Sequence, residues 1–169
     1  HPPRFCERYP KEVPLALSRE ELALSAAFAD FRDGIRRLTA PSGGRKIRAG
    51  RFAVELLGKR LLSCPFTFSD SWSRIRAGLK ASESSTEGDL FAAERAVREE
   101  IDDDLEAESR QALAASAIGG WLHPLAAELT GEIHALEAAL SALGLDTHSG
   151  LGVPARDARI TALIGWIES

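Results

Sequence analysis

Apolar residues recur along this chain at helical spacing, and the clearest run lies between Arg51 and Leu79. Apolar residues three or four positions apart share one face of a helix. A proline fits the first turn of a helix and disrupts its interior, so Pro65 predicts a break between two consecutive helices. The expected apolar stripes are Val54, Leu57 and Leu61 in the first helix, and Phe68, Trp72, Ile75 and Leu79 in the second.

A further stripe precedes this pair and predicts a helix of its own. Ser18 and Glu21 have the Ser-x-x-Glu spacing of a capping box, which marks a helix start. The Pro-Ser-Gly-Gly sequence at 41–44 predicts a loop after this helix. The stripe between the two signals consists of Leu24, Phe28, Phe31, Ile35 and Leu38.

Two shorter helices are expected after the central pair. The helical period returns over residues 90–105, with acidic residues on the remaining faces. Residues 111–118 are rich in alanine and predict a helix that the two glycines at 119–120 should break or kink. The polar sequence ASESSTEG at 81–88 predicts a mobile connection before these helices.

The longest helix is expected near the end of the chain. Pro124 is placed to open it, and Gly144 is placed to stop it after about Leu143. Its stripe is Leu125, Leu129, Ile133, Leu136, Leu140 and Leu143. A flexible linker is predicted at 147–152. A final helix follows, with an apolar face of Ile160, Leu163, Ile164 and Ile167 and with Trp166 beside it.

These patterns predict an all-α fold, a multi-helix bundle or array of about six helices with little or no sheet. The expected organisation is an extended N-terminal segment over residues 1–17, followed by a helical domain over 18–145. Residues 146–169 are expected to form a linker and a C-terminal helix.

Composition agrees with one folded domain. The chain has 169 residues, of which 44% are hydrophobic and 27% charged, which is ordinary for a globular protein. No apolar run approaches the length of a membrane span, and Cys6 and Cys64 lack metal-ligand spacing, so a reduced cytoplasmic location without membrane contact is expected. The sequence begins with His and contains no Met, which predicts a piece of a longer protein.

Charge is distributed in two adjacent blocks of opposite sign. Residues 45–80 contain nine Lys or Arg against two acidic residues, a local charge of +7. Residues 81–110 contain eleven Asp or Glu against three Arg, a local charge of −8. Such blocks either pair with each other or face different partners.

The residues themselves indicate no catalytic, cofactor or metal site. Gly43-Gly44-Arg45-Lys46 lacks the full spacing of a phosphate-binding loop, and Ile47 stands where Ser or Thr would bind magnesium. The three aspartates at 102–104 lack the spacing of a calcium loop, and His123 and His134 lack the Glu-x-x-His spacing of a diiron site. The aspartates are interpreted as a solvated helix face, and the histidines as surface or capping residues.

Three segments, in order along the chain, resemble the region between the two ATPase lobes of bacterial Swi/Snf-type superfamily-two helicases. The first is PKEVPLALSREE at 10–21, which looks like that family's "P-x-x-x-x-V-x-L-S-x-E-E". The second is KRLLSCP at 59–65, similar to "K-R-L-x-S-S-P", with Cys64 in place of the commoner second Ser. The third is PARDAR at 154–159 and the helix after it, which resembles a "D-x-K" helix, with Arg159 in place of Lys.

This resemblance implies an inter-lobe helical fragment of an ATP-dependent translocase or helicase-like remodeller on double-stranded DNA. The fragment is expected to be non-catalytic, while the parent protein would bind ATP and magnesium in the flanking RecA-like lobes. Residues 146–169 would then lead toward the second lobe. The alternative that the sequence leaves open is a free-standing helical interaction or regulatory module.

The same resemblance makes the basic block the best candidate for contact with DNA. Within it, the residues expected to touch phosphates surround the glycine-rich loop; they are Arg45, Lys46, Arg48 and Arg51. The competing interpretation is that the neighbouring acidic block neutralises these side chains, or that water solvates them.

Overall fold

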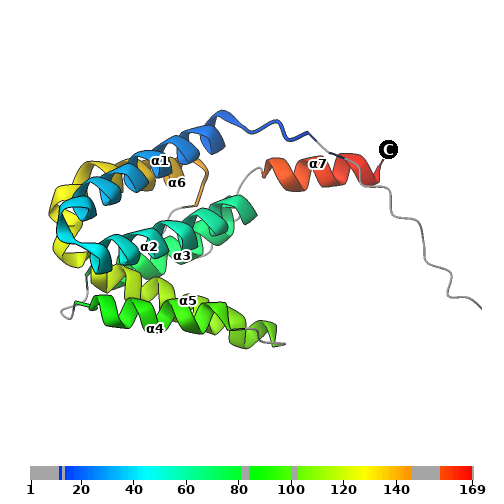
Figure 1. The fold of residues 1–169 in the computed structure, drawn as a ribbon. Helices are drawn as coiled ribbons and strands as arrows, with labels where there is room; N and C mark the ends of the chain where they lie inside the picture. The colour runs from blue at the N-terminus through cyan, green and yellow to red at the C-terminus, as the bar shows by residue number, and fades with distance from the viewer. Residues whose placement is uncertain (1–11, 13, 81–83, 100–102, 146–156, 169) are drawn as a thin grey trace, which may run out of the picture.

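The computed structural model describes residues 12, 14–80, 84–99, 103–145 and 157–168, and these are all-α (Figure 1). The α-helices are α1 (Arg19–Thr39), α2 (Gly44–Ser63), α3 (Pro65–Leu79), α4 (Glu87–Arg98), α5 (Asp104–Leu122), α6 (Thr130–Ala142) and α7 (Ala158–Ile167). Two 3-10 helices, η1 (Ala40–Ser42) and η2 (His123–Leu129), join α1 to α2 and α5 to α6. No strand occurs in this described part, so the predicted fold class is confirmed.

The first six α-helices pack as three stacked pairs. Figure 1 shows α1 beside α6, α2 beside α3, and α4 beside α5, and each of these pairs is in contact. Contacts between α1 and α2 join the first pair to the second, and contacts between α3 and α5 join the second to the third. None of the described helices combines the length and the apolar character needed to cross a membrane.

The predicted central helix pair is confirmed, and its second helix supplies the middle of the core. Helix α2 ends at Ser63 and α3 begins at Pro65. Phe68, Trp72 and Ile75 are completely buried, as their spacing predicts. The Phe68 and Trp72 rings are parallel with centroids 6.4 Å apart, and Phe31 of α1 meets Trp72 edge-on at 5.3 Å. In α2, Leu57 of the expected stripe is buried, while Val54 and Leu61 are only partly buried.

Helix α5 continues through the two glycines, so the predicted break is wrong. The helix runs through Gly119 and Gly120 to Leu122. The glycines lie where α5 crosses α3 closely, and the contact between the two helices favours the helical conformation there. The Cα atom of Gly78 in α3 would lie 2.9 Å from a Cβ atom added to Gly119. A Cβ atom added to Gly78 would lie 2.6 Å from the backbone oxygen of Ser116. The two backbones therefore touch where neither carries a side chain.

The predicted helix over residues 90–105 is confirmed only as far as Arg98, where α4 ends, and α5 starts separately at Asp104. The side chain of Asp103 caps α5 by accepting hydrogen bonds from the N–H groups of Leu105 and Glu106, at 2.8 and 3.4 Å. An aspartate at this position satisfies N–H groups that have no partner inside the helix. Asp103 therefore marks a helix start, Asp104 is an exposed residue of the first turn, and Asp102 lies outside the described residues.

The expected longest helix is divided. Residues 123–129 form η2, and α6 begins only at Thr130, so α1 is the longest helix described. All six residues of the predicted stripe are nevertheless buried, which confirms the face that the spacing indicated. Gly144 has a φ of +73°, and the N–H of Leu145 reaches back to the carbonyl of Leu140 at 2.9 Å, so the predicted stop is confirmed.

The predicted linkers lie partly outside the described residues. Residues 84–86 are non-helical, as expected, but Glu87 and Gly88 belong to the first turn of α4, which Thr86 caps. Three predicted segments lie wholly or partly outside the described residues. They are the N-terminal segment, apart from residues 12 and 14–17; the connection at 81–88, of which 81–83 are not described; and the linker at 147–152. The final helix is confirmed as α7, and its four stripe residues are 49–69% exposed.

Candidate functional site

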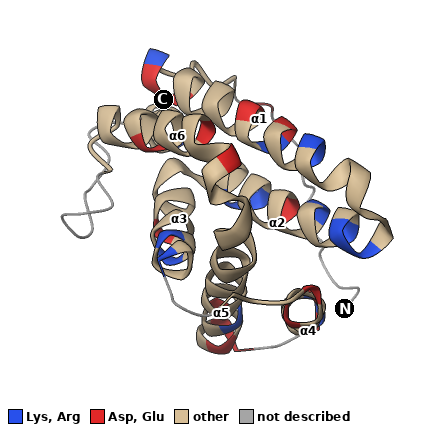
Figure 2. Ribbon diagram, turned by 90° about the vertical axis from the view of Figure 1, so that its left-hand side faces the viewer, with Lys and Arg blue, Asp and Glu red and all other residues tan. Residues whose placement is uncertain are grey.

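The predicted DNA-contacting residues lie in the first two turns of α2, just after Gly43, whose φ of +87° turns the chain into the helix. Arg45, Arg48 and Arg51 are exposed and Lys46 is partly buried. Figure 2 shows a group of basic residues at the turn from α1 into α2. The side chains of Arg45 and Lys46 make no ion pair or hydrogen bond with another described residue.

Arg48 differs from the other three because an acidic partner already holds it. Its Nε and Nη2 atoms donate to Oε2 of Glu94 at 3.1 and 3.0 Å. Its guanidinium also lies 4.7 Å from the centre of the Phe91 ring. Glu94 is buried, and its other oxygen pairs with Arg98 at 3.0 Å.

The interpretation that the acidic block neutralises the four predicted residues holds, within the described residues, for Arg48 alone, although the two blocks also pair at other points. Arg60 of α2 pairs with Glu108 of α5 at 3.4 Å. In the opposite sense, Arg98 of the acidic block pairs with Glu55 of the basic block at 3.4 Å. Together with Arg48 and Glu94, these pairs join α2 to α4 and α5. The end of the basic block nearest the glycine loop is left with the unpaired Arg45 and Lys46.

A second candidate site lies where the start of α1 meets the start of α7, and we call it the α1–α7 junction. Its central group is the carboxylate of Glu21, which is only 4% exposed. One oxygen accepts from the backbone N–H of Ser18 at 2.8 Å and completes the predicted capping box. The other oxygen accepts from the backbone N–H of Ala158 at 3.1 Å, across 137 residues of chain.

Arg159 and Asp157 complete the α1–α7 junction. The Nη2 atom of Arg159 donates to the backbone oxygen of Leu61 at 3.3 Å, and its Nη1 atom lies 4.0 Å from Oε1 of Glu21. Asp157 is 5% exposed and caps α7 by accepting from the N–H groups of Arg159 and Ile160, at 2.8 and 3.3 Å. The start of α7 is therefore fixed to both α1 and α2.

The hydrogen bonds at the junction keep Glu21 ionised. Burial by itself raises the pKa of a carboxyl group, but the N–H groups of Ser18 and Ala158, the Ser18 hydroxyl and the charge of Arg159 act in the opposite direction. Their combined effect holds the pKa of Glu21 below its usual value of 4.5. A charged carboxylate is the form that accepts both backbone N–H groups.

Sequence reasoning identified Glu21 as a cap but did not predict the junction. Each of the three segments that carry the family resemblance contributes to it: Glu21 from the first, Leu61 from the second and Arg159 from the third. A capping box uses one carboxylate oxygen and leaves the other available. That spare oxygen was the only signal in the sequence that Glu21 has a further partner.

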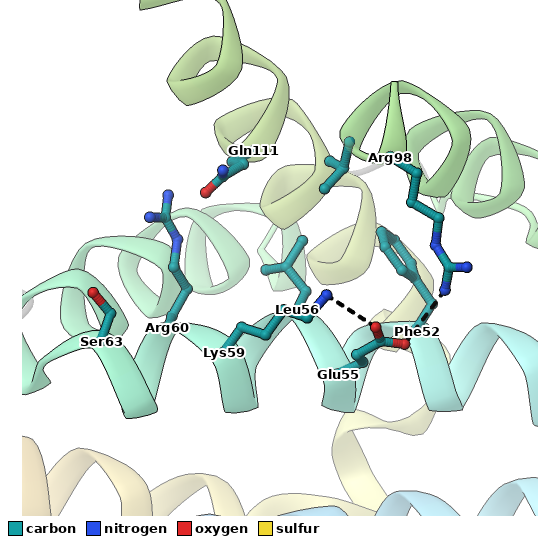
Figure 3. A pocket seen from close by; sticks show the side chains of 9 residues that line it. Phe52, Glu55, Leu56, Lys59, Arg60, Ser63, Arg98 and Gln111 are labelled. Carbon is teal, nitrogen blue, oxygen red and sulfur yellow. Dashed lines mark hydrogen bonds and ion pairs between the residues drawn. The ribbon is translucent and has the colours of Figure 1, made fainter. Parts of the chain in front are cut away.

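A pocket of about 200 Å³ lies between α2, α4 and α5 and was also not predicted (Figure 3). Phe52 and Leu56 of α2 and Val97 of α4 give it apolar walls. Arg60 of α2 and Gln111 of α5 line its polar end, and Figure 3 shows their side chains extending toward each other. The Nε atom of Arg60 is buried and has no hydrogen-bond partner in the part of the chain that the structure describes.

The histidines are placed as interpreted. Nδ1 of His123 donates to the backbone oxygen of Leu79 at 2.6 Å and so caps the end of α3, while His134 is exposed on α6. Within the described ranges, no three His, Cys, Asp or Glu side chains come close enough together to hold a metal ion. Comparison of the chain with protein-family models, curated proteins and solved structures finds no match.

Proposed function

We propose that this chain is the helical region between the two ATPase lobes of a Swi/Snf-type DNA translocase, where it sets the position of the second lobe. The α1–α7 junction is the observation that carries the proposal. A domain inserted between two parts of a protein must take the chain in and return it at nearly the same place. The backbone nitrogen of Ala158 lies 3.1 Å from Oε1 of Glu21, so the first residue of α7 is beside the first turn of α1.

The exposed face of α7 supports the same function. Ile160, Leu163 and Ile167 are 57%, 54% and 69% exposed, although their spacing is that of a buried stripe. A helix that is anchored at its start by polar contacts and exposes an apolar face is suited to pack against a following domain. In the family that the chain resembles, the second lobe follows this helix.

The coding sequence on both sides of the chain tests the proposal directly. We expect an ATPase lobe with a phosphate-binding loop before His1 and a second lobe after Ser169. A start codon just before His1 and a stop codon right after Ser169 would instead show a free-standing helical module. The exposed face of α7 would then serve a separate partner.

DNA contact is the second part of the proposal, and the basic end of α2 is where we expect it. Arg45, Lys46 and Arg51 have no ion pair within the described residues, so their charges are available to phosphates, although the charge of Arg51 also helps to lower the pKa of Glu55. Arg48 is already paired with Glu94, and we expect it to contribute less. Binding that depends on phosphate contacts weakens steeply as the salt concentration rises.

We predict that changing Arg45, Lys46 and Arg51 together to Ala lowers the affinity for duplex DNA by about tenfold or more at low salt, because each lost phosphate contact reduces counterion release. The measurement is fluorescence anisotropy of a labelled duplex at two salt concentrations. A variant with Arg19, Lys80 and Arg95 changed to Ala removes the same charge from exposed positions elsewhere and is the control. Equal loss in both variants, or no binding by the native chain, would reject this site in the isolated chain.

A further inference from the structure

The pocket between α2, α4 and α5 combines an apolar body with one unsatisfied cationic donor. Phe52 and Leu56 are 5% and 7% exposed, and Val97 is partly buried beside them. The polar end carries Arg60, whose side chain is 16% exposed. Such a combination is typical of a site for a small amphipathic ligand.

The other two cations of the pocket are already satisfied. Lys59 pairs with Oε1 of Glu55 at 3.1 Å, and Arg98 pairs with Oε2 of the same carboxylate at 3.4 Å. The hydrogen bond from Lys59 and the charges around it lower the pKa of Glu55, so this carboxylate stays ionised at neutral pH. Figure 3 shows the two pairs at one end of the pocket, away from Arg60.

The guanidinium of Arg60 is less completely paired than the charged groups of Lys59 and Arg98. Its one acidic partner in the described ranges is Glu108, which is 58% exposed and reaches only Nη2, at 3.4 Å. Its Nε donor is buried without a partner among the described residues. A buried donor without an acceptor costs free energy. A carboxylate in the pocket cannot reach the buried Nε, but it would give the guanidinium of Arg60 a second charge-assisted partner beside Glu108.

We propose that this pocket binds a small monocarboxylate with an apolar body. The carboxylate accepts hydrogen bonds from Arg60 and from the amide of Gln111, while the apolar body lies against Phe52, Leu56 and Val97. The volume of about 200 Å³ is smaller than that of pockets for drug-sized molecules and suits a medium-chain acid. This binding activity does not depend on the proposed role between ATPase lobes.

The test is isothermal titration calorimetry of the chain with octanoate, and with octan-1-ol as the neutral ligand of the same chain length. We expect saturable binding of octanoate and at least tenfold weaker binding of the alcohol, which cannot pair with the guanidinium. Arg60→Met is expected to weaken octanoate binding by about tenfold or more, because it keeps the apolar stem and removes the charged donors. Arg95→Met, an exposed change on α4 outside the pocket, is expected to leave binding unchanged.

A second variant tests the apolar wall without changing any charge. Val97→Phe fills the pocket while it keeps Arg60, so it should also weaken octanoate binding, and circular dichroism establishes that each variant is folded. If Arg60→Met does not fold, Val97→Phe decides the result. Failure of the native chain to bind octanoate saturably, or unchanged binding in Val97→Phe or in a folded Arg60→Met variant, would overturn the proposal.

Discussion

Replacing Gly119 with Ala is expected to destabilise the protein by about 3 kcal/mol or more, the upper end of the usual cost of overpacking. The added Cβ atom would overlap the backbone oxygen of Ile75 and lie 2.9 Å from the Cα atom of Gly78. Both neighbours are backbone atoms of α3, so no side chain can turn away to make room. Relief requires α3 and α5 to separate along their crossing. Urea denaturation followed by circular dichroism measures the free energy of unfolding.

Gly58→Ala is the matched control because Gly58 also lies inside a helix but has ordinary space around it. A Cβ atom there would lie 3.7 Å from the ring of Phe28, a normal contact distance. Alanine favours a helix over glycine by about 1 kcal/mol, so this change is expected to be neutral or stabilising. Stabilisation by both substitutions would contradict the close crossing and show that propensity alone governs α5.

The crossing of α3 and α5 also explains why the sequence wrongly predicted a helix break at Gly119 and Gly120. Two adjacent glycines weaken a helix by local propensity, and propensity is the only information that the sequence carries there. The partner that makes the glycines favourable is Gly78, which lies 41 positions before Gly119. Spacing identified apolar faces well, because the stripes of α1, α3 and η2–α6 depend on residues that are close in the chain. It could not show which backbones touch.

Helix boundaries show the same division between local and distant causes. The capping box of α1 and the glycine stop after α6 were predicted because each lies within a few residues of the boundary it controls. The separation of α4 from α5 was missed because the pattern of apolar residues continues across it. Asp103 was read by its charge and not as a cap, although its side chain has the role that Ser18 has in α1.

The candidate sites were less predictable than the fold because they depend on pairs that are far apart in sequence. The block charges indicated pairing between the blocks, but not that Arg48 would meet Glu94 while Arg45 and Lys46 stay unpaired. The pocket combines residues from three helices, and its central feature is a missing hydrogen bond at Arg60. An unsatisfied donor is a property of the packed structure and has no sequence pattern.

The α1–α7 junction yields the second large effect, and Glu21→Gln is the change that tests it. We expect a loss of about 1–3 kcal/mol, because a neutral amide has one acceptor oxygen and leaves one of the partly buried N–H groups of Ser18 and Ala158 without a partner. The first N–H groups of a helix have no partner inside it, so protection of the Ala158 amide depends on Glu21. Hydrogen exchange at Ala158 should therefore accelerate in this variant.

The pH dependence of the native chain gives the same contact a second readout, with Glu20→Gln as the control. Because the pKa of Glu21 is below 4.5 in the folded protein, the unfolded chain takes up the proton first as the pH falls. The stabilisation by Glu21 is thus complete above pH 4.5 and is lost as the pH falls through the lower folded-state pKa. Glu21→Gln should lack this part of the acid dependence.

Glu20 is exposed in the same turn of α1, so Glu20→Gln should retain both the acid dependence and the slow exchange at Ala158. If Ala158 exchanges equally fast in the native chain and in Glu21→Gln, then α7 is not held by this carboxylate, and the structural argument for a region inserted between two lobes fails with it.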